Sequence, residues 1–236
     1  MELAQDSQPE YLEDDENGIR YGEIPEKPKG IMRILCIGDS ITWGQGADPR
    51  DTMSYPGQLK TLLNDTEYYE IINLGMKGYS LRNDTPHAYM KKDEYTKALA
   101  SRPDIVIIML GTNDARYVHN DTEFVGAFKH MVGSFIELDT LPHVYVMTPP
   151  PVYVTDNKCL VNQRIVNNYY SKLIPDLARE NGLPERNIID VFNALGGKSL
   201  DLGYCFCDEA TCDGVHPVND GYKIIAKVVY KTLFDN

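Results

Sequence analysis

Two residues near the C-terminus could form the acid–base part of a catalytic triad. Asp213 and His216 stand three positions apart in the segment Asp-Gly-Val-His-Pro, so both side chains can face one crevice. A neutral imidazole can remove the proton of a serine hydroxyl, while a carboxylate fixes the imidazole tautomer and stabilises the imidazolium. A histidine before a proline is more often structural, but its pairing with an aspartate favours the catalytic interpretation.

The candidate nucleophile is Ser40, which lies near the other end of the chain in Gly38-Asp39-Ser40-Ile41-Thr42. The segment follows an apolar run, and a serine close behind a glycine can occupy a tight turn with its hydroxyl exposed. The alternative is a plain helix cap, because serine and aspartate both favour the N-cap position.

Two further segments offer N–H donors for an oxyanion. Gly75 and Gly78 follow the next apolar run, and a loop with two glycines can bring its backbone close to a ligand. Asn113 follows the run after that, in Gly-Thr-Asn-Asp, and its side-chain amide could donate to the same oxygen. The structural alternatives are a turn that needs positive φ at glycine and an Asx turn at Asn113.

These segments must be positioned by the apolar runs that precede them. The runs predict strands over Ile31–Ile37, Tyr69–Asn73, Asp104–Leu110, Val144–Thr148 and Asn187–Val191. Segments with helical spacing lie between and after them, at Ser54–Asn64, Tyr89–Ala100, Thr122–Leu138, Val161–Asn181 and Asn219–Phe234. The strands are continuously apolar, as expected when helices cover both faces, and strands separated by helices imply a parallel sheet.

We therefore predict a three-layer α/β/α domain, doubly wound around a five-stranded parallel sheet. In open sheets of this kind the active site lies beyond the carboxyl ends of the strands. The four candidate segments follow strands or open the last helix, so one crevice could collect them.

The composition fits a soluble globular domain with a real core. The chain has 236 residues, of which 42% are apolar and 25% charged, close to the usual averages. Acidic residues number 35 and basic residues 23, giving a net charge of −12 that repels phosphate backbones and acidic lipid surfaces. We expect no nucleic-acid or membrane partner; the oligomeric state stays open.

Residues 1–30 differ from the rest, because they are acidic and contain prolines. We expect residues 1–30 to be a tail and residues 31–236 to be the folded domain. No secretion signal is visible. Asn-Asp-Thr triplets at Asn64, Asn83 and Asn120 match the glycosylation pattern and favour an extracellular location only slightly.

The cysteines near the C-terminus offer an alternative use for His216. Cys205, Cys207 and Cys212 precede it at spacings that could bind zinc, although a zinc site would leave the other three segments unexplained. We favour a disulfide and leave its pairing open among Cys159, Cys205, Cys207 and Cys212. We expect no metal and no cofactor.

A phosphate-binding loop is a weaker alternative. Gly196-Gly197-Lys198-Ser199 is superficially similar to the end of such a loop, but Phe192 occupies the position of its first glycine.

In chain order the four candidate segments resemble the blocks of the SGNH (GDSL-type) hydrolase superfamily, from Ile31 to the C-terminal helix. The resemblance implies a flavodoxin-like sheet and a serine esterase. It makes Ser40 the nucleophile and also an oxyanion donor through its N–H, together with Gly78 and Asn113, and it makes Asp213 and His216 the acid and base of the triad.

The segment from Arg102 to Asp114 further resembles the carbohydrate acetylesterase branch, which includes sialate O-acetylesterase-like members. Polar and aromatic residues near the strand ends suit a sugar better than an acyl chain. The predicted substrate contacts are Asp39, Trp43, Tyr79 and Arg116. The alternatives are a lipase, lysophospholipase or thioesterase of the same superfamily, and a non-catalytic carbohydrate-binding protein, which would lack a triad member.

Overall fold

The computed structural model of the chain describes residues 24, 26–65, 67–153, 160–199 and 213–234. Residues 1–23 and 25 of the predicted tail lie outside the described residues, whereas 24 and 26–30 are described. The cysteines of the predicted disulfide, at positions 159, 205, 207 and 212, also lie outside the described residues, and three of them belong to the zinc alternative.

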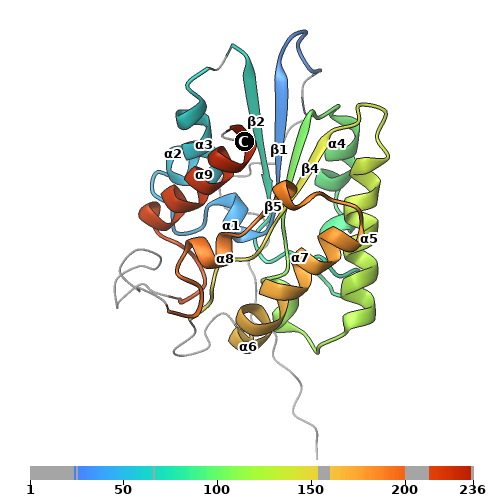
Figure 1. Cartoon of the computed structure of the whole chain (residues 1–236), viewed down its shortest axis with the longest axis vertical. Helices are drawn as coiled ribbons and strands as arrows, with labels where there is room; N and C mark the ends of the chain where they lie inside the picture. The colour runs from blue at the N-terminus through green and yellow to red at the C-terminus, as the bar shows by residue number, and fades with distance from the viewer. Residues whose placement is uncertain (1–23, 25, 66, 154–159, 200–212, 235–236) are drawn as a thin grey trace, which may run out of the picture.

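One parallel sheet organises the described part of the chain, with strand order β2-β1-β3-β4-β5 (Figure 1). Its strands are β1 (Met32–Gly38), β2 (Tyr69–Gly75), β3 (Ile105–Met109), β4 (His143–Met147) and β5 (Ile188–Ile189). The five-stranded parallel sheet predicted from the sequence is confirmed. Strand β5 is shorter than predicted because the Asp190 side chain accepts the N–H of Asn193 and so starts a helix.

Helices cover both faces of the sheet (Figure 1). They are α1 (Ser40–Trp43), α2 (Arg50–Met53), α3 (Tyr55–Leu63), α4 (Asp93–Ala100), α5 (Asp121–Ile136), α6 (Gln163–Ile165), α7 (Ser171–Glu180), α8 (Val191–Ala194) and α9 (Asn219–Phe234). Helices α3 and α9 pack together on one face, and α4, α5 and α7 lie on the other.

Strand β3 explains why the apolar runs are continuous. Successive side chains of a strand point to opposite faces. Val106 and Ile108 belong to the core beneath α5 and α7, whereas Ile105, Ile107 and Met109 belong to the core beneath α3 and α9. All five side chains are buried, so the sheet is the central layer of three.

Two predicted helices are less regular than expected. The first begins with a 3₁₀ turn at Tyr89–Lys91 before α4 starts at Asp93. In the second, a π-helical segment at Val166–Tyr170 joins α6 to α7. The wide turns of π segments occur often at functional sites.

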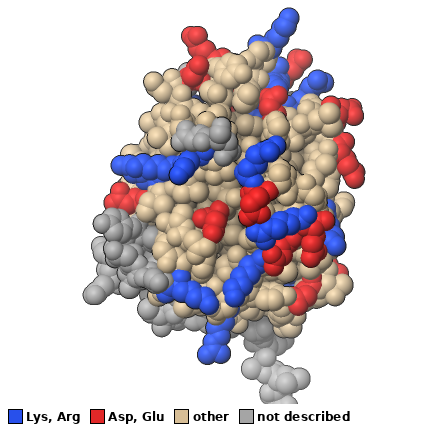
Figure 2. Space-filling model, viewed as in Figure 1, with Lys and Arg blue, Asp and Glu red and all other residues tan. Residues whose placement is uncertain are grey.

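Charge is mixed on the face of the molecule seen in Figure 2, where lysines and arginines are interspersed with acidic residues. None of the described helices is long and apolar enough to span a bilayer.

Candidate active site

Ser40 is the first residue of α1, directly beyond the carboxyl end of β1. Its neighbour Asp39 caps the helix, because the Asp39 Oδ1 atom accepts the N–H of Ile41 at 2.9 Å. The capping role that was an alternative for Ser40 is therefore filled by Asp39. The Ser40 hydroxyl is left for another partner.

Two glycines let this short helix approach the strand ends. Gly38 and Gly75 are paired in register at the ends of β1 and β2. A Cβ atom on Gly75 would lie 2.1 Å from the backbone nitrogen of Trp43, and one on Gly38 would lie 2.0 Å from the Oγ1 atom of Thr42. A side chain at Gly75 would require α1, and Ser40 with it, to move, and one at Gly38 would also lie 2.6 Å from the carbonyl oxygen of Met109 in β3.

The structure brings the three predicted triad residues together. The Oγ atom of Ser40 lies 2.7 Å from Nε2 of His216, and Nδ1 of His216 is hydrogen-bonded to Oδ2 of Asp213. The other oxygen of Asp213 accepts the backbone N–H groups of Val215 and His216, both at 2.9 Å. The spacing of three residues thus closes a tight loop that orients the imidazole before α9 begins.

The ionisation of Asp213 follows from these contacts. Burial by itself would raise its pKa, but the hydrogen bond and charge of His216, with the two backbone N–H groups, lower the pKa of Asp213 to about 2. The carboxylate is therefore ionised at neutral pH and accepts a hydrogen bond from Nδ1 of His216. In the tautomer with its proton on Nδ1, Nε2 is the acceptor for the Ser40 hydroxyl.

Other elements hold the Asp213–His216 loop in place. The N–H of Tyr153, beyond β4, donates to the carbonyl of Gly214 at 2.7 Å. The preceding residue, Val152, exchanges two hydrogen bonds of 2.8 Å with the side chain of Asn167 in the π-helical segment. Sequence patterns contain no signal for Asn167, because its partner lies in a different element, 15 positions earlier in the chain.

Of the three predicted oxyanion donors, Ser40 lies on α1, and Gly78 and Asn113 lie on loops that touch each other. Gly78 has φ = +81° in the loop after β2, a conformation that favours glycine. Asn113 begins a 3₁₀ turn after β3, and its Nδ2 atom donates to the carbonyl of Tyr79 at 3.0 Å. An amide nitrogen carries two hydrogens, so one N–H holds the loop and the other can serve a ligand. Their catalytic roles stay predictions.

One predicted substrate contact is not supported by the structure. Asp39 is 1% exposed, because its side chain turns inward to cap α1 and does not face a crevice. Burial raises the pKa of Asp39 to about 7, although the N–H of Ile41 and the charge of His216 oppose this. Asp39 is thus a buried, weakly acidic capping residue beside the nucleophile.

The other three predicted contacts are partly exposed: Trp43 is the last residue of α1, Tyr79 lies in the loop after β2, and Arg116 ends the 3₁₀ turn after β3. The Trp43 ring lies 4.4 Å from Nζ of Lys77 and 4.5 Å from the Arg50 guanidinium, both within cation–π range. The Tyr79 ring meets the ring of His87 edge-on at 5.7 Å. Arg116 lies near the same histidine. The pKa of His87 is lowered chiefly by burial, and also by the positive charges of Arg116 and Lys92.

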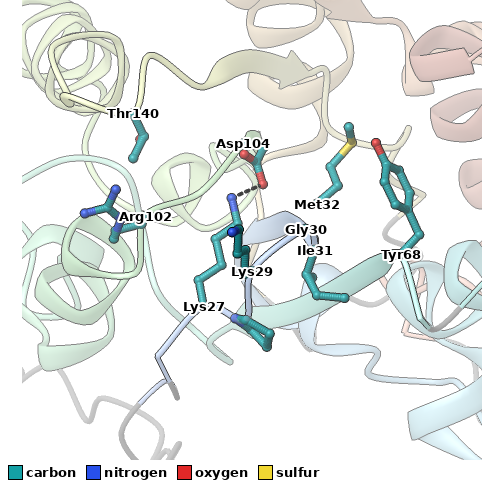
Figure 3. Close-up of a pocket in the computed structure, with 10 residues that line it drawn as sticks. Lys27, Lys29, Gly30, Ile31, Met32, Tyr68, Arg102, Asp104 and Thr140 are labelled. Carbon is teal, nitrogen blue, oxygen red and sulfur yellow. Dashed lines mark hydrogen bonds and ion pairs between the residues drawn. The ribbon is translucent and has the colours of Figure 1, made fainter.

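A separate cavity of about 560 Å³ lies at the amino ends of the strands, the opposite end of the sheet from the triad (Figure 3). It is lined by residues that begin or precede strands, among them Met32, Tyr68 and Asp104, and the Asp104 carboxylate pairs with Nζ of Lys27 at 2.5 Å. The triad lies beyond the carboxyl ends of the strands, so this cavity is not part of the candidate active site.

No metal site accompanies the triad within the described residues, where no group of three or more histidine, cysteine or acidic side chains could hold an ion. The cysteines of the zinc alternative lie outside them. Both ring nitrogens of His216 are engaged by Ser40 and Asp213, which leaves neither for a metal.

Comparison with known proteins gives this geometry a context. Residues 36–224 match the model of the GDSL-like Lipase/Acylhydrolase family. The chain is 26% identical over 227 residues to an acetylxylan esterase of Xylanibacter ruminicola, with 87% of this chain and 44% of that protein covered. The chain thus spans less than half the length of that relative.

Solved structures share the fold. The aryl esterase of M. smegmatis superposes with a TM-score of 0.63 at 20% identity, covering 86% of this chain and 99% of that one. The carbohydrate acetylesterase Est24 of Sinorhizobium meliloti gives 0.61 at 19% identity, covering 86% and 98%. A catalytic mutant of Axe2, an acetylxylan esterase from Geobacillus stearothermophilus, gives 0.62 at 20% identity, covering 86% and 94%. The predicted superfamily fold is confirmed.

Proposed function

The chain belongs to the GDSL-like lipase/acylhydrolase family, a family of carboxylic ester hydrolases, and on this premise we propose that it is a serine esterase that removes acetyl groups from carbohydrates. The observation that carries the proposal is the hydrogen-bonded series from Ser40 through His216 to Asp213.

In the proposed reaction Nε2 of His216 accepts the Ser40 proton while Oγ attacks the ester carbonyl carbon. The N–H groups of Ser40 and Gly78, with the amide of Asn113, stabilise the negative charge on the carbonyl oxygen. His216 then returns the proton to the leaving alcohol, which leaves acetyl-Ser40. Water attacks this intermediate with the same proton transfers, releasing acetate and restoring the hydroxyl.

A carbohydrate alcohol is favoured as the leaving group by two kinds of support. One is the similarity to proteins described as acetylxylan esterases and as a carbohydrate acetylesterase. The other is the character of the described residues near the strand ends, where the aromatic side chains of Trp43 and Tyr79 and the guanidinium of Arg116 are partly exposed. A long acyl chain needs an apolar surface instead.

The test is acetate release from acetylated xylo-oligosaccharides, run beside p-nitrophenyl acetate and p-nitrophenyl octanoate. We expect the wild type to release acetate from the sugars and to cleave the acetyl ester faster than the octanoyl ester. Ser40→Ala should lose all three activities. Ser134→Ala should keep them, because the Ser134 hydroxyl lies on α5, where it donates to the carbonyl of Met131 and accepts from the hydroxyl of Tyr95. Faster cleavage of the octanoyl ester would contradict the sugar-acetate assignment.

A further inference from the structure

Asp114 makes hydrogen bonds that have no role in the proposed reaction. It follows Asn113 directly at the carboxyl end of β3 and is 1% exposed. Its Oδ2 atom accepts the N–H of Leu81 at 2.9 Å, and its Oδ1 atom accepts the N–H of Arg82 at 2.8 Å. Both amides belong to the loop that begins after β2 and contains Gly78.

Asn113 binds the same loop at a third point, through the carbonyl of Tyr79 at 3.0 Å. Two consecutive residues after β3 therefore hold the segment Tyr79–Arg82, whose first residue adjoins Gly78. Gly78 and Asn113 come from loops that follow different strands, and these hydrogen bonds join the two loops beside the site. Farther from the site, Nη1 of Arg82 also donates to the carbonyl of Val118 at 2.7 Å.

We propose that Asp114 is a positioning residue that fixes the Gly78 N–H relative to the Asn113 amide, so that both donors meet one oxyanion. The inference rests on the proposed esterase function. Donors help only within a few tenths of an ångström of the right place, and a displacement of about 1 Å can cost about 100-fold in rate.

The chemistry of the contact explains why a carboxylate is present. Two neighbouring N–H groups require two acceptor atoms, which a carboxylate has and an amide lacks, because the NH₂ of asparagine would face one of the N–H groups. Burial of this carboxyl is unfavourable to its charged form and raises the pKa of Asp114 to about 6. The N–H groups of Leu81 and Arg82 and the charge of Arg82 act in the opposite direction and lower the pKa.

The test uses Asp114→Asn, which preserves size and removes one acceptor. Active sites are first counted by complete reaction with a fluorophosphonate, so that every rate refers to folded protein with a reactive serine. On p-nitrophenyl acetate we expect kcat per active site to fall by about 10- to 100-fold, with KM within about threefold. If Asp114→Asn yields no folded protein, Asp114→Ser, which keeps a single oxygen acceptor, is measured against the same thresholds.

Two comparisons separate positioning from a structural role. Asp104→Asn makes the same exchange at the opposite edge of the sheet, where the carboxylate accepts the N–H of Arg33 at 2.7 Å, and it should leave kcat within about threefold of the wild type. Asn113→Ala combined with Asp114→Asn should lose less than the product of the two single losses, because both act on one oxyanion site.

A kcat per active site within threefold of the wild type in the Asp114 variant, or losses that multiply in the double variant, would overturn the inference. If Ser40→Ala is inactive at the same time, the esterase function stands and only the role of Asp114 fails. An inactive wild type, or an active Ser40→Ala, would instead refute the proposed function itself.

Discussion

The hydroxyl of Ser40 lies 2.7 Å from Nε2 of His216, although the two residues are 176 positions apart in the chain. The contact exists because α1 begins at the end of β1 while the Asp213–His216 loop leads into α9, which packs beside α3 on the same face of the sheet. An early and a late segment of the chain thus bring a nucleophile and a base to the same end of the parallel sheet, beyond the carboxyl ends of its strands.

Asn113→Ala should lower kcat on p-nitrophenyl acetate by about 10²- to 10³-fold, because it removes an oxyanion donor. KM should change little, since the interaction strengthens only in the transition state. Asn187→Ala is the matched control: it removes a buried amide that donates to the Val144 carbonyl at 2.8 Å, and it should lower stability without this loss of kcat. A change in kcat below threefold in Asn113→Ala would remove that residue from the oxyanion site.

Asp213→Asn should lower kcat by about 10³- to 10⁴-fold, because an amide stabilises neither the imidazolium nor the tautomer with a proton on Nδ1. The depressed pKa of Asp213, about 2, also means that its ionised form stabilises the fold above its unfolded pKa of about 4. This stabilisation is lost as the pH falls toward 2.

Urea denaturation of the wild type and Asp213→Asn at pH 7 and at pH 2.5 checks the second effect. The difference in their free energies of unfolding should be larger at pH 7. An equal difference at both pH values would show that the carboxylate is not held by His216 and the backbone in the way described.

Asp39→Asn should change the pH dependence of stability in the opposite sense. The native pKa of Asp39 is about 7 and the unfolded pKa about 4, so between these values the native state keeps a proton that the unfolded state has lost. Wild-type stability therefore falls across this range. Asparagine still caps α1 but does not ionise, so the variant should gain stability relative to the wild type as the pH rises from 5 to 7.

Urea midpoints for both proteins at unit steps from pH 5 to pH 8 provide the measurement. The control is Asp190→Asn, which makes the same exchange at the exposed N-cap of α8. Its difference from the wild type should stay flat. A flat difference for Asp39→Asn as well would contradict a buried carboxyl beside Ser40.

Gly75→Ala should reduce both stability and kcat, because the new Cβ would lie 2.1 Å from the backbone nitrogen of Trp43 and push α1 away from the sheet. We expect a loss of about 1–3 kcal/mol in the free energy of unfolding. Gly126→Ala on α5, where a Cβ would meet nothing within 4 Å, should instead leave activity unchanged and stabilise the helix slightly. If Gly75→Ala had the same stability and the same kcat as the wild type, the close packing of α1 on the sheet would be contradicted.

The strands and long helices could be predicted because burial on two faces leaves continuous apolar runs and helical periodicity. Helix α1 could not, since four residues carry no periodicity, and the trimming of β5 depends on a cap at Asp190. The triad residues were found because their types and local spacing carry the chemistry. A helix cap at this point was an open alternative, since serine and aspartate both favour the N-cap position, and the structure assigns it to Asp39. The hydrogen bonds of Asp114 to Leu81 and Arg82 could not be predicted, because they join loops that meet only in the folded chain.

The role of Ser40 is tested most directly by peptide mass spectrometry after reaction with a fluorophosphonate. We predict one phosphonyl group per chain, carried by the peptide that contains Ser40, together with complete loss of ester hydrolysis as the label is incorporated. Labelling of a different residue, or full hydrolytic activity in protein labelled at Ser40, would contradict the assignment of this serine as the nucleophile.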